Sequence, residues 1–263
     1  MFKREMKINL KNFLIWTGIL LALFLMVYLI YPSLVDEKNI SSMNDMMKMF
    51  PEDVLKAFNM DISGIDSAFG WLKTEGFVFL LLITGVYSSI LGSNILLKEE
   101  NDKTIEYLNS LPITRKQIIL SKIICGLIYI TAMIFMVGVF NYIGLYLSGD
   151  FNKKEYLCLS VTPWFSSVVF FSLSLFLSTF THKTKKVFGM SLGIVFISYF
   201  LQILSQMSEK AEKIKYLSIF TLADIRNVIE KQTLNAGMIS VAIVLTIIFL
   251  VMAAIHYDRK ELV

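Results

Sequence analysis

The sequence has few of the residues that build disulfide frameworks, metal sites and catalytic centres. Among its 263 residues only two are cysteine and two are histidine. Cys125 and Cys158 fall near opposite ends of neighbouring apolar stretches, so no disulfide or metal framework is expected. His182 and His256 lie at the ends of apolar stretches, where a histidine is most simply an interfacial residue. The chain is therefore predicted to have no catalytic or metal-binding residues of its own.

Long stretches of the sequence also lack charged residues, and these stretches predict the fold class. The chain is 56% hydrophobic with mean hydropathy +0.64, which is too apolar for an ordinary soluble domain. A helix of about 20 apolar residues crosses a bilayer core, whereas a barrel strand needs about half that length. The sequence predicts an all-α integral membrane protein, one transmembrane domain over residues 1–263 with six spans. The stretches without Asp, Glu, Lys or Arg are 12–35, 76–97, 123–149, 156–182, 187–208 and 232–257.

The orientation of the spans follows from the basic residues in their flanks. One alternating set of flanks comprises 1–11, 98–122, 183–186 and 258–263, and the other comprises 36–75, 150–155 and 209–231. The first set holds 14 Lys and Arg residues in 46 positions, and the second holds 11 in 69. Because basic flanks stay in the cytoplasm, both termini are predicted to be cytoplasmic. The net charge of +4 follows from this asymmetry and gives no reason to expect a nucleic-acid partner.

A source of energy is missing as well. The six stretches contain no ionisable residue of the kind that ion-coupled pumps keep at membrane depth. The chain also lacks the G-x-x-x-x-G-K phosphate loop, so a transporter built on it requires a separate energy-supplying subunit. The adjacent Glu99 and Glu100 raise the alternative of an intramembrane glutamate protease. Such an enzyme needs partner histidines, and neither His182 nor His256 is expected to lie where it could serve.

The spans do contain mild polar residues, which allow two interpretations. Hydrogen bonds between helices are favoured over a polar translocation path. These residues are Ser88, Ser89, Ser93, Asn94, Asn141, Ser166, Ser167, Ser172, Ser174, Ser178, Ser191, Ser198 and Gln202. Gly189 and Gly193 form a G-x-x-x-G pattern that lets helices approach closely, either within the subunit or at a dimer seam.

Segment 98–122, KEENDKTIEYLNSLPITRKQIILSK, has too ordered a pattern for a plain loop. Asn101 and Asp102 are good N-cap residues for a short helix, and Pro112 stops it. Apolar residues recur three apart in this helix: Ile105, Leu108 and Leu111. One interpretation is an interfacial helix resting on lipid headgroups. The acidic residues of the segment weigh against it, because the inner leaflet surface is negative.

A second helix is predicted to follow directly. Thr114 and Gln117 fit a capping box, and Ile113 and Ile118 occupy the hydrophobic staple positions around it. This helix is expected to start at about Arg115 and to continue into the third span.

The same segment resembles a known family. Glu99-Glu100, the run from Lys103 to Leu108, the run from Leu111 to Arg115, and Lys122 match E-E-x-x-x-T-x-E-x-L-x-x-x-P-[IV]-[ST]-R-x-x-x-x-x-x-K. This pattern is typical of the permease subunits of ABC transporters of the type-2 exporter class. The family often has Gly where this chain has Lys103.

The resemblance implies a coupling helix in the coupling loop 98–122, which docks on a separate nucleotide-binding ATPase subunit that holds ATP and Mg. Residues implied in this contact are Glu99, Glu100, Thr104, Glu106, Leu108, Pro112 and Arg115. It also implies a dimer with a second permease copy or a paralogue.

Two other segments resemble parts of the same family. Residues 1–11 resemble its amphipathic elbow helix, although a positively charged anchor explains their charges equally well. Residues 50–58 resemble its outer loop. The outer loop 36–75 is interpreted as an amphipathic helix on the outer membrane surface or as a methionine-rich surface for hydrophobic ligands. A short helix is expected around 221–230.

The function implied is the transmembrane subunit of an ATP-driven exporter, with no enzymatic activity of its own. Because the spans lack charge, the substrate class is amphipathic or hydrophobic: a peptide, drug or lipid. The expected location is the plasma membrane of a bacterium, where the multi-pass chain contacts membrane lipid. The alternative is a membrane anchor or scaffold without transport.

Overall fold

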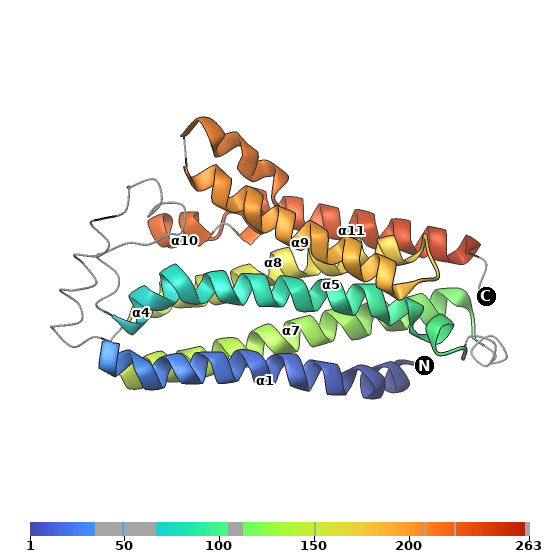
Figure 1. Ribbon diagram of the computed structural model, residues 1–263, viewed down its shortest axis with the longest axis horizontal. Coiled ribbons are helices and arrows are strands. Elements are labelled where there is room, and N and C mark those ends of the chain that lie inside the picture. The colour runs from blue at the N-terminus through green and yellow to red at the C-terminus, as the bar shows by residue number, and fades with distance from the viewer. Residues whose placement is uncertain are drawn as a thin grey trace.

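The computed structural model is a bundle of long helices (Figure 1). The structure describes residues 1–34, 49, 67–104, 113–149, 151–207, 209–223 and 225–260. Within these residues every regular element is a helix, and six helices are long and apolar enough to cross a membrane. The predicted all-α class and the six spans are thereby confirmed.

The six spanning helices run alternately up and down the bundle, and shorter helices precede or follow some of them. In order they are α1 (Phe2–Leu34), α4 (Ala68–Trp71), the π-helical η2 (Leu72–Gly76), α5 (Phe77–Asn101), α7 (Arg115–Ser148), α8 (Lys153–Ser178), α9 (Thr184–Met207), the 3-10 helices η3 (Glu209–Leu217) and η4 (Ile219–Ala223), α10 (Ile225–Lys231) and α11 (Ala236–Arg259). Both chain ends lie at the same end of the bundle as the α5–α7 connection (Figure 1). We call this the loop end and the opposite one the far end.

The second span is longer than its charge-free stretch. It begins at Ala68, where the Ser67 hydroxyl accepts a hydrogen bond from the Gly70 N–H at 3.0 Å, and continues through η2 into α5. Lys73 lies inside this run and pairs with Glu155 of α8 at 3.2 Å. Residues 68–75 of the predicted outer loop are therefore helical. The resemblance in residues 50–58 lies outside the described residues.

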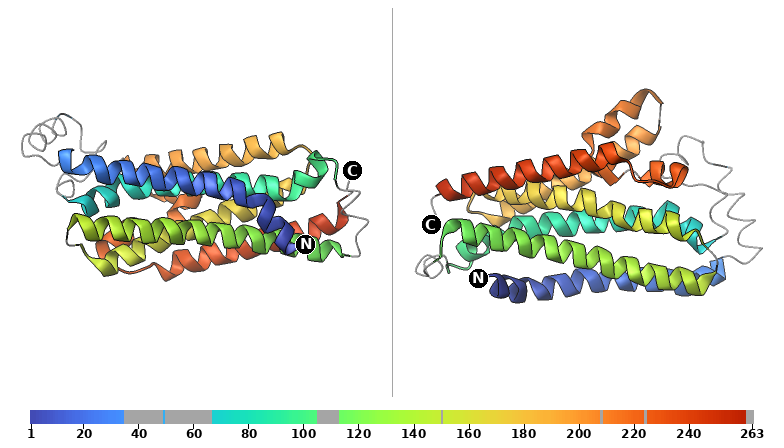
Figure 2. Two further views of the ribbon diagram at one scale, coloured as in Figure 1. Left: turned by 90° about the horizontal axis from the view of Figure 1, so that it is seen from below. Right: turned by 180° about the vertical axis from the view of Figure 1, so that it is seen from behind.

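The first and last parts of the chain add detail to the predicted layout. Residues 2–11 are the first turns of α1, which bends there (Figure 2, left). The helix expected around 221–230 is divided into η4 and α10.

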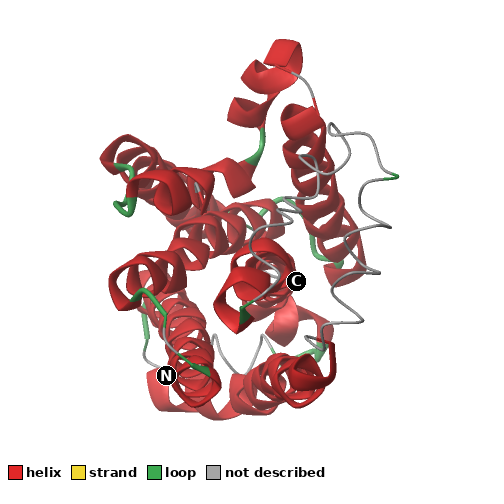
Figure 3. Cartoon of the chain, turned by 90° about the vertical axis from the view of Figure 1, so that its left-hand side faces the viewer, coloured by secondary structure: helices red, strands yellow, loops and turns green. Residues whose placement is uncertain are grey.

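The centre of the bundle is the pair α5 and α8. Burial reaches 61% and 72% in the apolar windows of these spans but only 17% in that of α11, which leaves α11 at the periphery. Figure 3 shows the helices nearly end on. A Cβ added at Gly92 of α5 would lie 2.4 Å from the Phe171 carbonyl oxygen and 2.9 Å from the Ser174 Cβ. The two backbones thus approach so closely that only glycine fits.

Several serines in the spans form hydrogen bonds within their own helix. Several donate to a carbonyl of their own helix: Ser93 to Ile90, Ser166 to Pro163, Ser172 to Val169 and Ser178 to Leu175. The expectation of hydrogen bonds between helices was wrong for these four, because the carbonyl three residues earlier lies within reach of a serine hydroxyl. Asn141 of α7 does bond between helices, since it accepts from the Tyr28 hydroxyl of α1 at 3.2 Å.

Aromatic rings join the helices at the far end. Phe69, Tyr142, Phe151 and Tyr156 have ring centroids 5.5 to 6.3 Å apart. Tilted and edge-to-face contacts at such distances stabilise the packing without fixing one geometry. The far end is therefore held by aromatic contacts together with the Lys73–Glu155 ion pair.

Gly92→Ala tests the close approach of α5 and α8. The added methyl group would collide with backbone, so we expect a loss of about 1–3 kcal/mol in the free energy of unfolding. Gly18→Ala is the matched control, because nothing lies within 4 Å of the Cβ position there. Thermal unfolding of both variants in the same detergent checks this. Equal stability of the two would contradict the assigned packing.

Candidate functional site at the loop end

The loop between α5 and α7 leaves α5 through a defined turn. The Lys103 N–H donates to the Glu100 carbonyl at 3.4 Å, and the Thr104 N–H donates to the Glu99 carbonyl at 2.9 Å. This pair of bonds is the Schellman motif, in which the residue after the cap is left-handed and usually glycine. Lys103 has that conformation, with φ 54°. The turn explains why glycine suits this position in the family that the segment resembles.

Asn101 does not cap a new helix. It is the last residue of α5, where its side-chain amide donates to the Leu97 carbonyl at 2.7 Å and contacts the Thr184 hydroxyl at the start of α9. The N-cap prediction for Asn101 was wrong because the Schellman turn, which the sequence pattern did not reveal, places this residue before the turn.

The start of α7 is as predicted. The Thr114 hydroxyl accepts from the Gln117 N–H at 3.3 Å, and the Gln117 side chain accepts from the Thr114 N–H at 3.0 Å. This capping box satisfies two backbone donors at the helix start. Ile118 is buried in the main core cluster and Ile113 packs against the same cluster, as the staple positions require.

The first of two ionic clusters surrounds Lys122 of α7. Its ammonium group lies 2.8 Å from a Glu99 carboxylate oxygen and 3.2 Å from Glu5 Oε1, and donates to the Ile95 carbonyl at 2.6 Å. Lys122 is 1% exposed and Glu99 is 2% exposed. All three N–H groups thus have acceptors, and the cluster joins α1, α5 and α7.

The second cluster surrounds Lys260, which follows α11. Its ammonium group lies 2.7 Å from Glu100 Oε1 and donates to the carbonyls of Thr181 at 2.9 Å and Ser178 at 3.4 Å. Both charged side chains are buried. Lys260 therefore satisfies carbonyl groups at the C-terminal end of α8 while it neutralises a carboxylate of α5.

His182 belongs to this second cluster. Its Nδ1 lies 2.6 Å from Glu100 Oε2, and its side chain is half exposed. This contact arises because the α8–α9 turn meets the end of α5. The expectation that neither histidine could serve an intramembrane protease stays a prediction. His256 instead packs its ring on Phe180.

Arg115, at the start of α7, bonds to the end of α11. Its Nη1 donates to the carbonyls of Asp258 at 2.9 Å and Lys260 at 2.8 Å. The first residue of the helix that follows the loop is thereby fixed to the same short segment that holds Glu100.

The predicted contact residues divide into two groups. Glu99, Glu100 and Arg115 bond within the chain, and Thr104 is partly exposed at the Schellman turn. Glu106, Leu108 and Pro112 lie outside the described residues. The contact of these seven residues with an ATPase stays a prediction. What sequence reasoning missed is Lys260, because a lysine beyond the last span reads as an ordinary basic flank.

The described residues of this site hold the ends of five helices together through buried ion pairs and hydrogen bonds. Each buried carboxylate is engaged by a lysine, so neither glutamate is free to act as a base. Among the described residues no group of three or more His, Cys, Asp or Glu could hold a metal ion. The intramembrane protease alternative therefore finds no support at Glu99 or Glu100.

Six apolar helices long enough to cross a bilayer define a multi-pass membrane protein. A family model described as ABC-2 family transporter protein matches residues 2–262. The chain belongs to the ABC-2 transporter family and is a transmembrane permease. Permeases of this family are generally not catalytic themselves and work with an ABC ATPase. No curated protein and no solved structure matches the chain.

Lys122→Met tests the first cluster. Removing one partner leaves Glu5 and Glu99 buried without a counter-charge, so we expect a loss of about 3–5 kcal/mol in the free energy of unfolding. Lys116→Met, at an exposed position of the same helix, is the control and should change stability by less than about 0.5 kcal/mol. Thermal unfolding in mild detergent measures both. A Lys122 variant no less stable than the control would refute the structural role of the ammonium group.

Proposed function

We propose that the chain is the transmembrane subunit of an ATP-driven exporter and that its α5–α7 loop docks on a separate ATPase subunit. The observation that carries this proposal is the anchoring of both loop flanks by buried ionic and capping interactions, in a chain of the ABC-2 transporter family. A loop held in this way acts as a rigid lever. The loop end faces the cytoplasm, where ATP is available, because its flanks carry the basic excess. The membrane is the plasma membrane of a bacterium.

The partner supplies the nucleotide chemistry. ATP and Mg bind to the ATPase subunit, since this chain has no phosphate loop. Thr104, Glu106, Leu108 and Pro112 form the contact surface, with Glu106 accepting charge-assisted hydrogen bonds from Arg or Lys of the partner. The contact surface is held in position at its two ends by Glu99, Glu100 and Arg115.

The substrate is amphipathic or hydrophobic, such as a peptide, drug or lipid. In the described residues, ionised side chains within the spans gather towards helix ends, as at Lys73 and Lys122. The central part of the bundle is lined by apolar and small polar side chains. Such an interior suits a cargo that brings no net charge to the middle of the membrane.

A second permease copy packs against α9. A Cβ added at Gly189 or Gly193 would meet nothing within 4 Å, so the G-x-x-x-G face is not used for packing between described residues of this chain. Exposed apolar side chains continue the same region of α9, among them Phe196, Ile197 and Phe200. Two copies meeting at these glycines would bring their α9 backbones close together.

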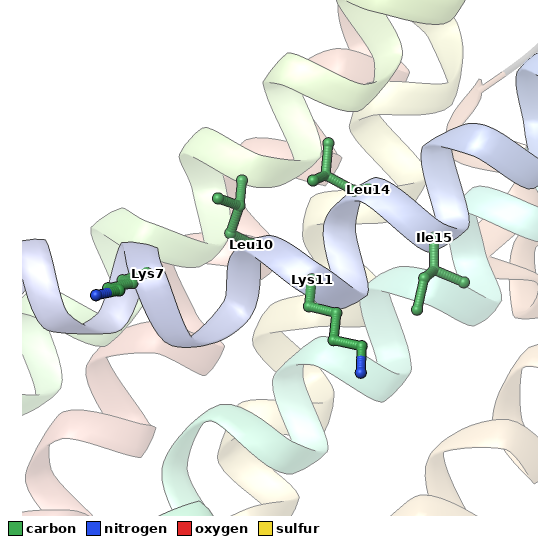
Figure 4. A pocket seen from close by; sticks show the side chains of 5 residues that line it. All are labelled: Lys7, Leu10, Lys11, Leu14 and Ile15. Carbon is green, nitrogen blue, oxygen red and sulfur yellow. The ribbon is translucent and has the colours of Figure 1, made fainter.

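Membrane lipid contacts the outer face of α1. Lys7, Leu10, Lys11, Leu14 and Ile15 line a shallow groove of about 500 Å³ (Figure 4). Lys7 lies nearest the loop end of this groove and Lys11 lies midway along it (Figure 4), and neither forms an ion pair with a described residue. They suit anionic headgroups of the inner leaflet, while the apolar residues lie against acyl chains.

The decisive experiment is co-purification followed by Glu106→Arg. An ATPase subunit of about 25–35 kDa should co-purify with the chain in mild detergent, in keeping with a single-domain ATPase. Glu106→Arg should leave insertion and the monomer fold unchanged but abolish ATPase binding, because it places like charge against the partner's basic residues. Quantitative immunoblotting of the purified complex measures the bound ATPase.

Asp53→Arg makes the same change of charge outside the predicted coupling loop, in the sequence between α1 and α4, and it should bind the ATPase as wild type does. If the unmodified chain isolates without any ATPase, the proposed function is wrong. If Glu106→Arg binds normally, the loop loses its assigned role.

Gly189→Leu tests the second copy. A bulky side chain would keep the α9 helices apart, so we expect the dimer association constant to fall by at least about tenfold, which corresponds to about 1.4 kcal/mol. Gly18→Leu is the control, since Gly18 on α1 also has open space around its Cβ position. Single-molecule photobleaching in nanodiscs counts the copies. A dimer fraction equal in both variants would place the seam elsewhere.

A further inference from the structure

Lys260 lies outside both flanks of the α5–α7 loop and bonds to each of them, in addition to the direct Glu99–Lys122 pair. Its ammonium group holds Glu100, four residues before Thr104, where the described part of the loop ends. Its carbonyl oxygen accepts from Arg115, the first residue of α7, at 2.8 Å. The two flanks are thus joined through one residue that lies far away in the sequence.

The same ammonium group also reaches a third element. It donates to Thr181 and Ser178 at the C-terminal end of α8, where helix carbonyls lack partners within the helix. Since α8 is the most enclosed span and packs on α5, this bond extends from the loop flanks to the centre of the bundle.

We propose that Lys260 is a positioning residue for coupling: it fixes both flanks of the loop relative to α8 and transmits displacement of the loop to the α8–α11 pair. The transmission of displacement rests on the proposed function. The fixing of the loop flanks by Lys260 does not depend on it. A buried ammonium group with three acceptors loses its hydrogen bonds if any of these elements moves alone. Loop, α8 and α11 are therefore expected to move as one unit.

The geometry also determines which substitutions can test the role of Lys260. Exchanging the charges as Glu100→Lys with Lys260→Glu would place a carboxylate against the carbonyls of Thr181 and Ser178, so this exchange does not rescue. Lys260→Met keeps the apolar stem and removes the charge. Lys260→Arg keeps the charge and the donors. Lys185→Met changes an exposed lysine at the same end and is the matched control.

Hydrogen exchange measured by mass spectrometry on the full chain in nanodiscs tests the structural part. In Lys260→Met the amides of residues 101–104 and 113–118 should exchange about 10- to 100-fold faster, as expected for the loss of a buried charged hydrogen bond. Amides of α10 at the far end should not change. Lys260→Arg should stay close to wild type, and so should Lys185→Met.

Each outcome of the hydrogen-exchange experiment either supports or overturns the proposal. Faster exchange confined to the two flanks supports the proposal. Unchanged exchange rates in both flanks overturn it. Faster exchange throughout the chain, α10 included, shows a general stabilising role and also overturns it. This measurement needs no ATPase, so it remains decisive even if the proposed function fails.

The transport consequence is measured on the complex with the ATPase subunit. Measured per bound ATPase subunit, the ratio of ATP hydrolysis by the Lys260→Met complex to that by the free ATPase should move towards one. Lys260→Arg should retain the wild-type ratio. Unaltered hydrolysis in Lys260→Met, with ATPase bound, would overturn the coupling role while leaving the proposed function intact.

Discussion

Two buried ammonium groups hold the loop end together. A buried lysine without a counter-charge costs several kcal/mol, so Lys122 and Lys260 each require a carboxylate in place. The helices that carry these carboxylates are fixed as a result: α1, α5 and α7 converge on Lys122, and α5, α8 and α11 converge on Lys260. α5 is common to both clusters because Glu99 and Glu100 are consecutive. One dipeptide therefore organises most of the helices at this end.

The two ends of the bundle are held by different proportions of ionic and aromatic contacts. At the loop end, hydrogen-bonded ion pairs of 2.7 to 3.2 Å prescribe distance and direction. At the far end, Phe69, Phe151 and Tyr156 pack by tilted and edge-to-face ring contacts, which tolerate small shifts. A directional network changes by exchanging partners, whereas an aromatic cluster changes by sliding. The loop end holds two buried lysine clusters, whereas the far end holds the Lys73–Glu155 pair among the described residues, so directional contacts are concentrated at the loop end.

The sequence predicted the spans better than the site. Charge-free stretches located all six helices because lipid tolerates few other segments, and the capping box at Thr114 was predicted because its signals are local. Asn101 was misassigned because the left-handed turn at Lys103 has no glycine to mark it. The pairing of Glu99 with Lys122 depends on three helices meeting, and Lys260 lies beyond the last span. Charged residues at span ends look like solvated flanks in a sequence, so their burial is visible only in three dimensions.

The anchors also explain why a short loop can act mechanically. A tether of flexible residues absorbs a displacement in its own conformational freedom, so little of it reaches the attached helices. Here the described chain stops being helical at Asn101, directly after the buried Glu100–Lys260 pair. It resumes at Arg115, which donates to the carbonyls of Asp258 and Lys260. A displacement applied between them must either move the attached helices or break a buried bond. Because breaking a buried charged pair is costly, movement of the helices is the favoured response.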